Sequence, residues 1–343
     1  MKVVIDEKIP YLRDALLALG CDVVAKPGTE INHDDVVDAD ALFVRTRTKC
    51  DENLLEGTSV RFIGTATIGY DHIDSCYCGQ KGIVWKNAAG CNAGAVLQYV
   101  QSVIYEWTPS LTGLSIGVIG CGEIGSRVAA WAESAGMSVY RNDPPKESMG
   151  MQGLVPLETI AEKCDIITFH TTLERGGAYP SYHLADNEFL NSLERCRLLI
   201  NASRGEVVDN LALLDALKSG KVGRAALDVW EGEPDINKEL LDMTFVATPH
   251  IAGYSAEGKI NATKIVLEAF LDFFGYQSGI VSLELPAPEN NVVVAASERE
   301  ALLSLYSPNG DTSSLKENPA DFERLRDNYK LRREPASYKI VLK

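Results

Sequence analysis

The sequence predicts an α/β protein with two doubly wound parallel sheets and a small α+β unit at its C-terminal end. Three observations lead to this fold class. Short apolar runs alternate twice with amphipathic helical patterns, which is the rhythm of βαβ units. A glycine-rich turn at residues 120–125 opens the second series, so a whole α/β unit precedes it. From about residue 281 the pattern changes to period-2 alternation interrupted by prolines.

The first series consists of short runs rich in Val, Ile and Phe, bounded by turn residues. Because helical patterns separate these runs, we expect a parallel sheet. The expected strands are 2–6, 22–26, 41–46, 61–67 and 82–87, and the expected helices are 11–20 and 92–107.

The second series has runs that are apolar nearly throughout, as expected for strands buried on both faces. Its expected strands are 114–120, 138–143, 164–170, 196–203, 223–229 and 244–250, followed by a helix at 256–274. We therefore expect residues 93–250 to form a domain inserted between 1–92 and 251–280. Residues 281–343 would form a third unit, with a charged helix at 321–334 and a last strand at 338–343.

The composition is that of a globular protein, with 45% hydrophobic and 24% charged residues among 343. The net charge of -15 argues against nucleic-acid and anionic-membrane partners. The eight cysteines form no CxxC pair, so we expect neither a metal site nor a disulfide framework, and scattered thiols suit a reducing cytoplasm. The N-terminal segment lacks the apolar core of a signal peptide, and no apolar run approaches the ~18 residues of a membrane span. We expect a cytoplasmic protein.

Residues Gly120, Gly122 and Gly125 fit the GxGxxG pattern, with Glu123 and Ile124 between the last two glycines. The pattern follows a predicted strand and opens a predicted helix, which is the context of a dinucleotide-binding Rossmann turn. The next strand ends in Asp143, an acidic residue placed to accept hydrogen bonds from the adenosine ribose, which favours NAD over NADP. The alternative is that Asp143 only caps the turn formed by the following two prolines.

Polar residues follow several strands of the second series, at the sheet edge where ligands bind in such folds. Arg204 can form a bidentate pair with a carboxylate. Glu233 can orient His250, which can exchange a proton near neutral pH. The alternatives are a structural ion pair for Arg204 and a plain turn residue for Glu233. His170 also ends a strand and is the rival base, but it lacks a nearby acidic partner in the sequence.

The segments "GVIGCGEIG", "INASRGEVVDNLALLDALKSGKVGRAALDVWEGEP" and "TPHIAGY" resemble the D-2-hydroxyacid dehydrogenase family in order and spacing, over roughly residues 1–275. The resemblance implies a Rossmann cofactor domain inserted in a flavodoxin-like substrate domain. It also implies a reaction in which His250 takes the C2 hydroxyl proton, Arg204 holds the substrate carboxylate and Glu233 stabilises the imidazolium. The further residues that it implies are Thr46, Thr67 and Tyr254 for the substrate, and Thr171, Ala202, Ser203, Arg204, Asp228 and Gly253 for NAD.

Further segments, among them "DEKIPY", "NDPPK", "HTTLERGGAYPSYHLAD" and "FERLRDNYKLRRE", are similar to one branch of that family. That similarity implies oxidation of 4-phospho-D-erythronate to 2-oxo-3-hydroxy-4-phosphobutanoate in pyridoxal 5'-phosphate biosynthesis. Residues 281–343 carry alternating apolar positions and a charged helix but little independent core, so we expect them to pack against a second copy in a homodimer. Two alternatives are a generic glyoxylate or hydroxypyruvate reductase and an NAD(H)-sensing co-repressor. The branch usually has Ser where this chain has Thr46, and its C-terminal region is usually longer.

The segment Arg45-Thr46-Arg47-Thr48-Lys49 follows the third expected strand. If it stays extended, period-2 alternation places Arg45, Arg47 and Lys49 on one face. Three neighbouring cations in a protein of net charge -15 suit a second anion on the substrate, and we expect Arg45 and Lys49 to bind a terminal phosphate. The alternative is a solvated basic edge.

Overall fold

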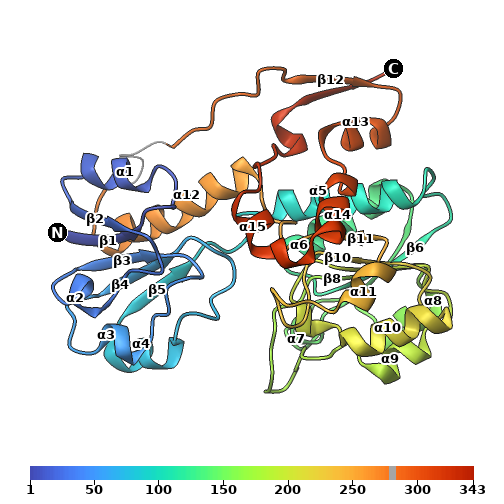
Figure 1. Ribbon diagram of the computed structural model, residues 1–343, viewed down its shortest axis with the longest axis horizontal. Coiled ribbons are helices and arrows are strands. Elements are labelled where there is room, and N and C mark those ends of the chain that lie inside the picture. The colour runs from blue at the N-terminus through green and yellow to red at the C-terminus, as the bar shows by residue number, and fades with distance from the viewer. Residues whose placement is uncertain (278–282) are drawn as a thin grey trace. The chain divides into compact units, whose positions relative to one another are not determined.

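The computed structural model describes residues 1–277 and 283–343 (Figure 1). It divides into two compact units, the first formed by 1–92 and 255–287 and the second by 93–254 and 288–343. The second unit thus interrupts the first, as expected of an inserted domain. The expected boundary at 280/281 lies outside the described residues.

The sheet of the first unit has the strand order β2-β1-β3-β4-β5, and all its pairings are parallel. This order is that of flavodoxin-like sheets, so the fold predicted for this unit is confirmed. Its strands are β1 (Lys2–Asp6), β2 (Asp22–Lys26), β3 (Ala41–Val44), β4 (Phe62–Thr65) and β5 (Val84–Asn87).

Helices cover both faces of this sheet, since successive side chains of each strand point to opposite sides. One core contains Phe43, Phe62 and Phe270, whose ring centroids lie 5.4–5.9 Å apart, and the other contains Leu42 and Ile63. The first core is closed by α1 (Leu12–Ala18) and α12 (Ala256–Phe273), the second by α2 (His33–Val36), α3 (Glu52–Leu55) and α4 (Ser75–Lys81).

The sheet of the second unit has the order β11-β10-β9-β8-β6-β7, again with parallel pairings. An isolated bridge from Arg141 to Leu154 continues the sheet beyond β7, which gives the doubly wound order with a switch point between β6 and β8. The predicted Rossmann fold is confirmed. The strands are β6 (Ser115–Ile119), β7 (Ser138–Asn142), β8 (Ile166–Phe169), β9 (Leu198–Asn201), β10 (Ala225–Leu227) and β11 (Val246–Ala247).

Helices lie on both faces of this sheet (Figure 1), and the two faces bury separate cores. Leu198 and Ile200 face one core and Leu199 the other, so each strand is buried on both sides. The first core includes α5 (Ala93–Trp107) and α6 (Glu123–Ser134); the second includes α8 (Leu157–Lys163), α9 (Asn187–Ser192), α10 (Asn210–Ser219) and α11 (Lys238–Met243). The short helices α7 (Pro144–Ser148) and η1 (Gly205–Val207) follow strand ends.

Residues 288–343 cluster with the second unit, which differs from the expected separate C-terminal domain. Leu302 and Tyr306 complete the core beside α5, and Leu315 and Phe322 join the opposite core. The elements are β12 (Val292–Ala295), α13 (Glu298–Leu305), α14 (Asn309–Glu317), η2 (Pro319–Asp321), α15 (Phe322–Asp327), η3 (Pro335–Ser337) and β13 (Lys339–Leu342). The charged helix expected at 321–334 is shorter, since α15 ends at Asp327, and Arg332 beyond it is buried.

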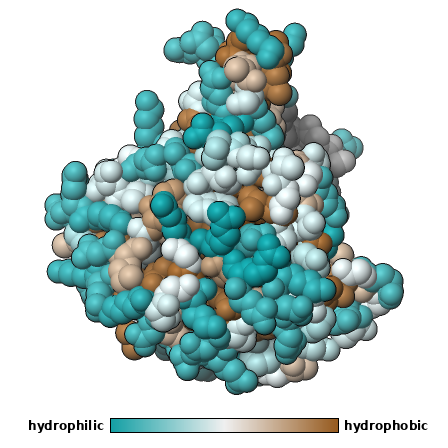
Figure 2. Space-filling view, turned by 90° about the vertical axis from the view of Figure 1, so that its right-hand side faces the viewer, coloured by the Kyte–Doolittle hydropathy of each residue, from teal (hydrophilic) through white to brown (hydrophobic). Residues whose placement is uncertain are grey.

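Strands β12 and β13 pair in parallel and form a ribbon with an apolar surface. Val292, Val294 and Leu342 are 50%, 51% and 55% exposed. Figure 2 shows hydrophobic surface on the projection at its top, where Figure 1 draws this ribbon.

None of the helices in the described part of the chain is long and apolar enough to cross a membrane. The eight cysteines are free thiols, and seven of them are buried.

Candidate active site

The glycine-rich turn joins β6 to α6. Gly120 has a φ of 88°, and a Cβ there would lie 2.7 Å from the carbonyl carbon of His170. Gly125 packs against the carbonyl oxygen of Gly120, so it has no room for a side chain either. Around Gly122, by contrast, a Cβ would meet nothing within 4 Å. The middle glycine is therefore the position at which a pyrophosphate can approach the backbone.

Asp143 follows β7 and uses its carboxylate to hold two backbone groups. Oδ2 accepts the N–H of Cys121 at 2.8 Å and Oδ1 accepts the N–H of Lys146 at 3.0 Å. Asp143 thus caps α7, as in the alternative interpretation, and also fixes the glycine-rich turn. Each carboxylate oxygen has a second lone pair, so the ribose-binding role is compatible with both contacts. The guanidinium of Arg141 forms an ion pair with the carboxylate of Glu133, with a nitrogen–oxygen distance of 2.8 Å.

Two buried polar atoms after β8 have no hydrogen-bond partner among the described residues: Nδ1 of His170 and Oγ1 of Thr171. Both belong to residues whose backbone contacts the first glycine of the turn. Buried polar atoms are rarely left unpaired, so a ligand at this place is expected. The space around Gly122 is open, and α6 begins at Glu123 and Ile124 directly after it. Together with the two unpaired atoms of His170 and Thr171, this arrangement fits a bound dinucleotide.

His170 is unsuitable as the proton acceptor. Burial lowers its pKa to about 3, and its Nε2 lies 3.0 Å from Oγ1 of Thr168. The ring is therefore neutral near pH 7 and does not exchange a proton there, which fits a structural or cofactor-side role rather than that of the base.

The backbone after β9 is shaped by Asn201. Its Oδ1 accepts hydrogen bonds from N and Oγ of Ser203, and its Nδ2 donates to the carbonyl of Arg204. One terminal nitrogen of Arg204 donates to the carbonyl of Ser203 at 2.8 Å. Ala202, which lies between Asn201 and Ser203 in the chain, is 8% exposed. These bonds place the Arg204 guanidinium at the carboxyl end of β9.

Glu233 and His250 are brought together directly. Nδ1 of His250 lies 2.8 Å from Oε2 of Glu233, and the side chains are 29% and 19% exposed. Oε1 of Glu233 accepts the N–H of Trp230 at 2.9 Å. Burial alone would raise the pKa of Glu233, but the charge and hydrogen bond of His250, with smaller contributions from Trp230 and Arg326, outweigh it and lower that pKa. Glu233 is thus held as a carboxylate against the imidazole.

The predicted trio follows three neighbouring strands, β9, β10 and β11. Arg204 comes directly after β9, Glu233 lies in the turn after β10, and His250 follows β11. Because carboxyl ends of parallel strands share one edge of a sheet, the topology places all three at the same edge.

Asp228, expected to line the cofactor site, is only 2% exposed. Oδ1 accepts hydrogen bonds from Thr248 Oγ1 at 2.7 Å and from the N–H of Ile251 at 2.8 Å, and Oδ2 accepts the N–H of Ala252 at 2.9 Å. Burial raises its pKa despite these bonds. Asp228 therefore anchors the loop after His250, and one lone-pair position remains for a cofactor donor.

Sequence reasoning did not find Arg326 of α15. Its Nε donates to the hydroxyl of Tyr254 at 3.2 Å, and its positive charge lowers the pKa of Glu233. The side chain is 19% exposed and also lies 4.0 Å from Glu323. Tyr254, a predicted substrate residue, is thus held by the C-terminal segment. The only signal in the sequence was the unusual density of charges in that segment.

In the first unit, the run after β3 does not stay extended, which corrects the expectation of three cations on one face. Residues 45–48 form a turn, in which Thr48 is buried and donates to the carbonyl of Gly28 at 2.7 Å. Nε of Arg45 pairs with buried Asp6 at 2.9 Å. Nζ of Lys49, which is 78% exposed, pairs with Asp51 at 2.9 Å.

Thr46 and Thr67 follow the neighbouring strands β3 and β4. Thr46 is exposed in the turn. The hydroxyl of Thr67 lies 2.7 Å from that of Thr65 and donates to the carbonyl of Gly69 at 2.8 Å. Both hydroxyls are therefore placed at the carboxyl edge of this sheet.

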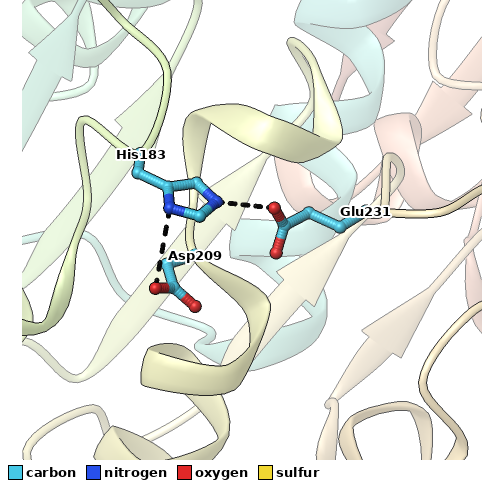
Figure 3. Close-up of side chains that lie close together, drawn as sticks. All are labelled: His183, Asp209 and Glu231. Carbon is cyan, nitrogen blue, oxygen red and sulfur yellow. Dashed lines mark hydrogen bonds and ion pairs between the residues drawn. The ribbon is translucent and has the colours of Figure 1, made fainter.

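A cluster of His183, Asp209 and Glu231 lies elsewhere in the second unit (Figure 3). Nε2 of His183 lies 2.6 Å from Glu231, and Nδ1 lies 3.7 Å from Asp209. Glu231 also accepts the N–H of Asn210, and Asp209 caps α10. The ring of Tyr182 stacks on His183 with centroids 4.1 Å apart. Because both carboxylates already accept protein hydrogen bonds, the cluster fits a clamp between loops better than a metal centre.

Residues 98–252 match the family model described as D-isomer specific 2-hydroxyacid dehydrogenase, NAD binding domain. A relative named erythronate-4-phosphate dehydrogenase in Bacteroides fragilis is 47% identical, with 100% of this chain and 99% of that protein aligned. Proteins of the same name in Bacteroides thetaiotaomicron and Proteus mirabilis are 48% and 40% identical, each over 99% of this chain, with 99% and 95% of their own lengths aligned.

Solved structures show the same architecture. An NAD+-bound 3-phosphoglycerate dehydrogenase of Entamoeba histolytica has a TM-score of 0.66 and 26% identity, over 80% of this chain and 95% of that one. The TT0316 protein of Thermus thermophilus has a TM-score of 0.67 and 24% sequence identity, and the match covers 81% of this chain and 99% of that one.

The fold, the glycine-rich turn and the His250–Glu233 pair define an NAD-dependent oxidoreductase of the D-2-hydroxyacid dehydrogenase class. Within that class the chain belongs to the erythronate-4-phosphate dehydrogenase family, because relatives of 40–48% identity align over 99–100% of it. This full-length similarity favours the predicted branch over a generic reductase and over a co-repressor.

Proposed function

We propose that this protein oxidises 4-phospho-D-erythronate at C2 with NAD, giving 2-oxo-3-hydroxy-4-phosphobutanoate for pyridoxal 5'-phosphate biosynthesis. The observation that carries the proposal is the His250–Glu233 pair, a proton acceptor and its carboxylate partner, at the same sheet edge as the glycine-rich turn. The names of the full-length relatives supply the substrate.

In the proposed mechanism, Nδ1 of His250 faces Glu233, so Nε2 is the nitrogen that takes the C2 hydroxyl proton. Glu233 stabilises the imidazolium that forms, because its carboxylate stays ionised in the pair. Arg204 holds the substrate carboxylate and draws electron density from the forming carbonyl. When bound, NAD supplies the hydride acceptor. The residues proposed to hold it are Gly120, Gly122, Glu123, Ile124, Gly125, Asp143, Thr171, Ala202, Ser203, Arg204, Asp228 and Gly253.

For the remainder of the substrate we propose Thr46, Thr67 and Tyr254 as hydrogen-bonding partners, and Arg45 and Lys49 as partners of the phosphate. The pairing of Arg45 with Asp6 is compatible with this role, because it engages Nε and leaves the two terminal nitrogens of the guanidinium. Asp6 would then orient a fork of donors for a phosphate.

The test is a substrate panel in which NADH formation is followed by its absorbance. We expect 4-phosphoerythronate to be oxidised with a far higher kcat/KM than erythronate, glycerate or 3-phosphoglycerate. Comparable kcat/KM values for 4-phosphoerythronate and erythronate would remove the phosphate assignment and leave a generic 2-hydroxy acid dehydrogenase.

We further propose a homodimer in the cytoplasm. The exposed apolar ribbon of β12 and β13 supports the dimer, since closed twofold pairs are the commonest soluble assemblies. Eight free thiols support a reducing compartment.

A further inference from the structure

The guanidinium of Arg332 is buried and has all its donors engaged. Arginine carries five N–H groups. Nε donates to Oε1 of Gln98 at 3.1 Å. One terminal nitrogen donates to the carbonyl of Ile251 at 3.1 Å and to the hydroxyl of Tyr329 at 3.2 Å. The other donates to the carbonyl of Ala95 at 3.1 Å and to that of Ala252. The residue is 8% exposed. Its position is thus fixed by five bonds to neutral acceptors.

Two of these acceptors are the carbonyls directly after His250. The N–H groups of the same two residues, Ile251 and Ala252, donate to the carboxylate of Asp228 at 2.8 and 2.9 Å. The backbone of these residues therefore lies between a buried anion on its N–H side and a buried cation, Arg332, on its carbonyl side. Both charges are stabilised by peptide dipoles of the right sign, which strengthens each bond in a low-dielectric interior.

His250 itself needs such support. Its φ is 57°, in the left-handed region that side chains other than glycine rarely adopt. Its own N–H donates to the carbonyl of Asp228 at 2.7 Å. Strained backbone persists only where neighbouring contacts determine it, and the bonds at the next two residues are such contacts.

We propose that Arg332 is a positioning residue, which holds the loop after His250 so that the imidazole meets Glu233 in the geometry for proton transfer. The inference rests on the proposed role of His250 and assigns to the C-terminal segment a part in catalysis. Arg332 reaches the reaction through the backbone of Ile251 and Ala252 and need not touch the substrate. The ring of Tyr306, 4.3 Å from the guanidinium carbon, supports the side chain from another direction.

The experiment compares R332K and R332M with the control R324M. Arg324 belongs to the same segment, but it is 66% exposed and pairs only with Asp321 among the ion pairs described. Lysine keeps the charge but has three donors, and methionine keeps only the bulk of the stem. We expect kcat for 4-phosphoerythronate to fall about 10- to 100-fold in R332M, because small displacements of a reacting group have effects of that size. R332K should lie between R332M and the unchanged protein, with KM and NAD affinity within about threefold and R324M unaffected.

A second measurement does not depend on the substrate. The chain has five histidines, so ¹⁵N-histidine labelling resolves the His250 imidazole by NMR. We expect the His250 signals to move in R332K and R332M, and those of His33 and His72 to stay in place. If the substrate assignment is wrong, turnover is absent in every variant while this shift remains.

Two results would overturn the proposal. One is a folded R332M that binds NAD normally and retains kcat within threefold with unmoved His250 signals. The other is loss of folding in both R332K and R332M, which would make Arg332 a support of the whole unit rather than of the catalytic loop.

Discussion

Nδ1 of His250 lies 2.8 Å from Oε2 of Glu233, so the imidazole is held by one nitrogen and presents the other. The first prediction concerns this base. H250N should lower turnover by ~10² to 10⁴, the usual contribution of a general base. NAD affinity, measured by fluorescence titration, should stay nearly unchanged, because the cofactor contacts proposed above do not include the imidazole.

The matched control is H170N, at the buried histidine that also ends a strand. It should keep the pH dependence of kcat/KM near neutrality, since the pKa of His170 is about 3. Turnover of H250N within a few-fold of the unchanged protein would refute the assignment.

The second prediction is a pH dependence of stability. The pKa of Glu233 is lowered in the folded state, so its charge stabilises the fold above the unfolded pKa of about 4.3. This contribution is lost as the pH falls through the folded pKa. E233Q should therefore be less stable than the unchanged protein at pH 7, and the two free energies of unfolding should converge as the pH falls through the lowered pKa of Glu233. Urea denaturation across that range measures both. A difference that is constant with pH would show that the ionised pair contributes nothing.

The third prediction concerns cofactor choice. D143A should weaken NAD binding and narrow the ratio of NAD to NADP efficiency, because a ribose acceptor and a negative charge are removed together. Since Asp143 also caps α7, the control is D186A, which removes a similar cap from α9. An unchanged cofactor ratio in D143A would mean that Asp143 acts only on the backbone of the turn.

The fourth prediction separates the two cations proposed for the phosphate. R45A leaves the fully buried Asp6 without its partner, a loss of up to about 3–5 kcal/mol that partial exposure of Arg45 reduces. K49A removes an exposed pair that water and salt screen, so it should contribute little to stability. R45A should thus lower the melting temperature, whereas K49A should not.

A comparison of 4-phosphoerythronate with unphosphorylated erythronate tests whether Arg45 and Lys49 bind the phosphate. A charge-assisted contact contributes about 1.5–3 kcal/mol, so each variant should raise KM for 4-phosphoerythronate about 10- to 100-fold. KM for unphosphorylated erythronate should not change. If both acids are affected equally, these residues do not bind the phosphate.

The fifth prediction concerns assembly. Light scattering at micromolar concentration should give a dimer, and V294D should shift it toward monomer because a charge enters the ribbon surface. L211D is the control, since Leu211 is 65% exposed in α10, outside the ribbon. A monomeric unchanged protein would refute the dimer.

Much of the fold was readable from the sequence because its signals are local. Strands such as 116–119 are apolar on both faces, and the spacing of Gly120, Gly122 and Gly125 is set by one turn. Glu233 and His250 were found because each stands just after a buried strand. These features need no knowledge of distant residues.

The features that the sequence did not predict depend on residues that are far apart in the chain. The run after β3 turns because Thr48 is buried and bonds to Gly28, 20 residues earlier. Apart from Tyr329, the residues to which Arg332 and Arg326 donate hydrogen bonds lie 72 to 237 residues away. Most partners of Arg332 are backbone carbonyls, which carry no side-chain signature. A charged pattern predicts a solvated helix, and nothing in its spacing distinguishes an arginine that is buried.

The order of synthesis gives the Arg332 contact a further meaning. Chains are made from the N-terminus, so Ala252 leaves the ribosome 80 residues ahead of the guanidinium that supports it. A nascent chain can form the glycine-rich turn and accept a dinucleotide while its proton-transfer loop still lacks support. Activity is then expected only once the last stretch of the chain has folded back. A protease that cuts after α15 would remove Arg332 and leave the core residues Leu315 and Phe322 in place. The product should bind cofactor and turn over slowly.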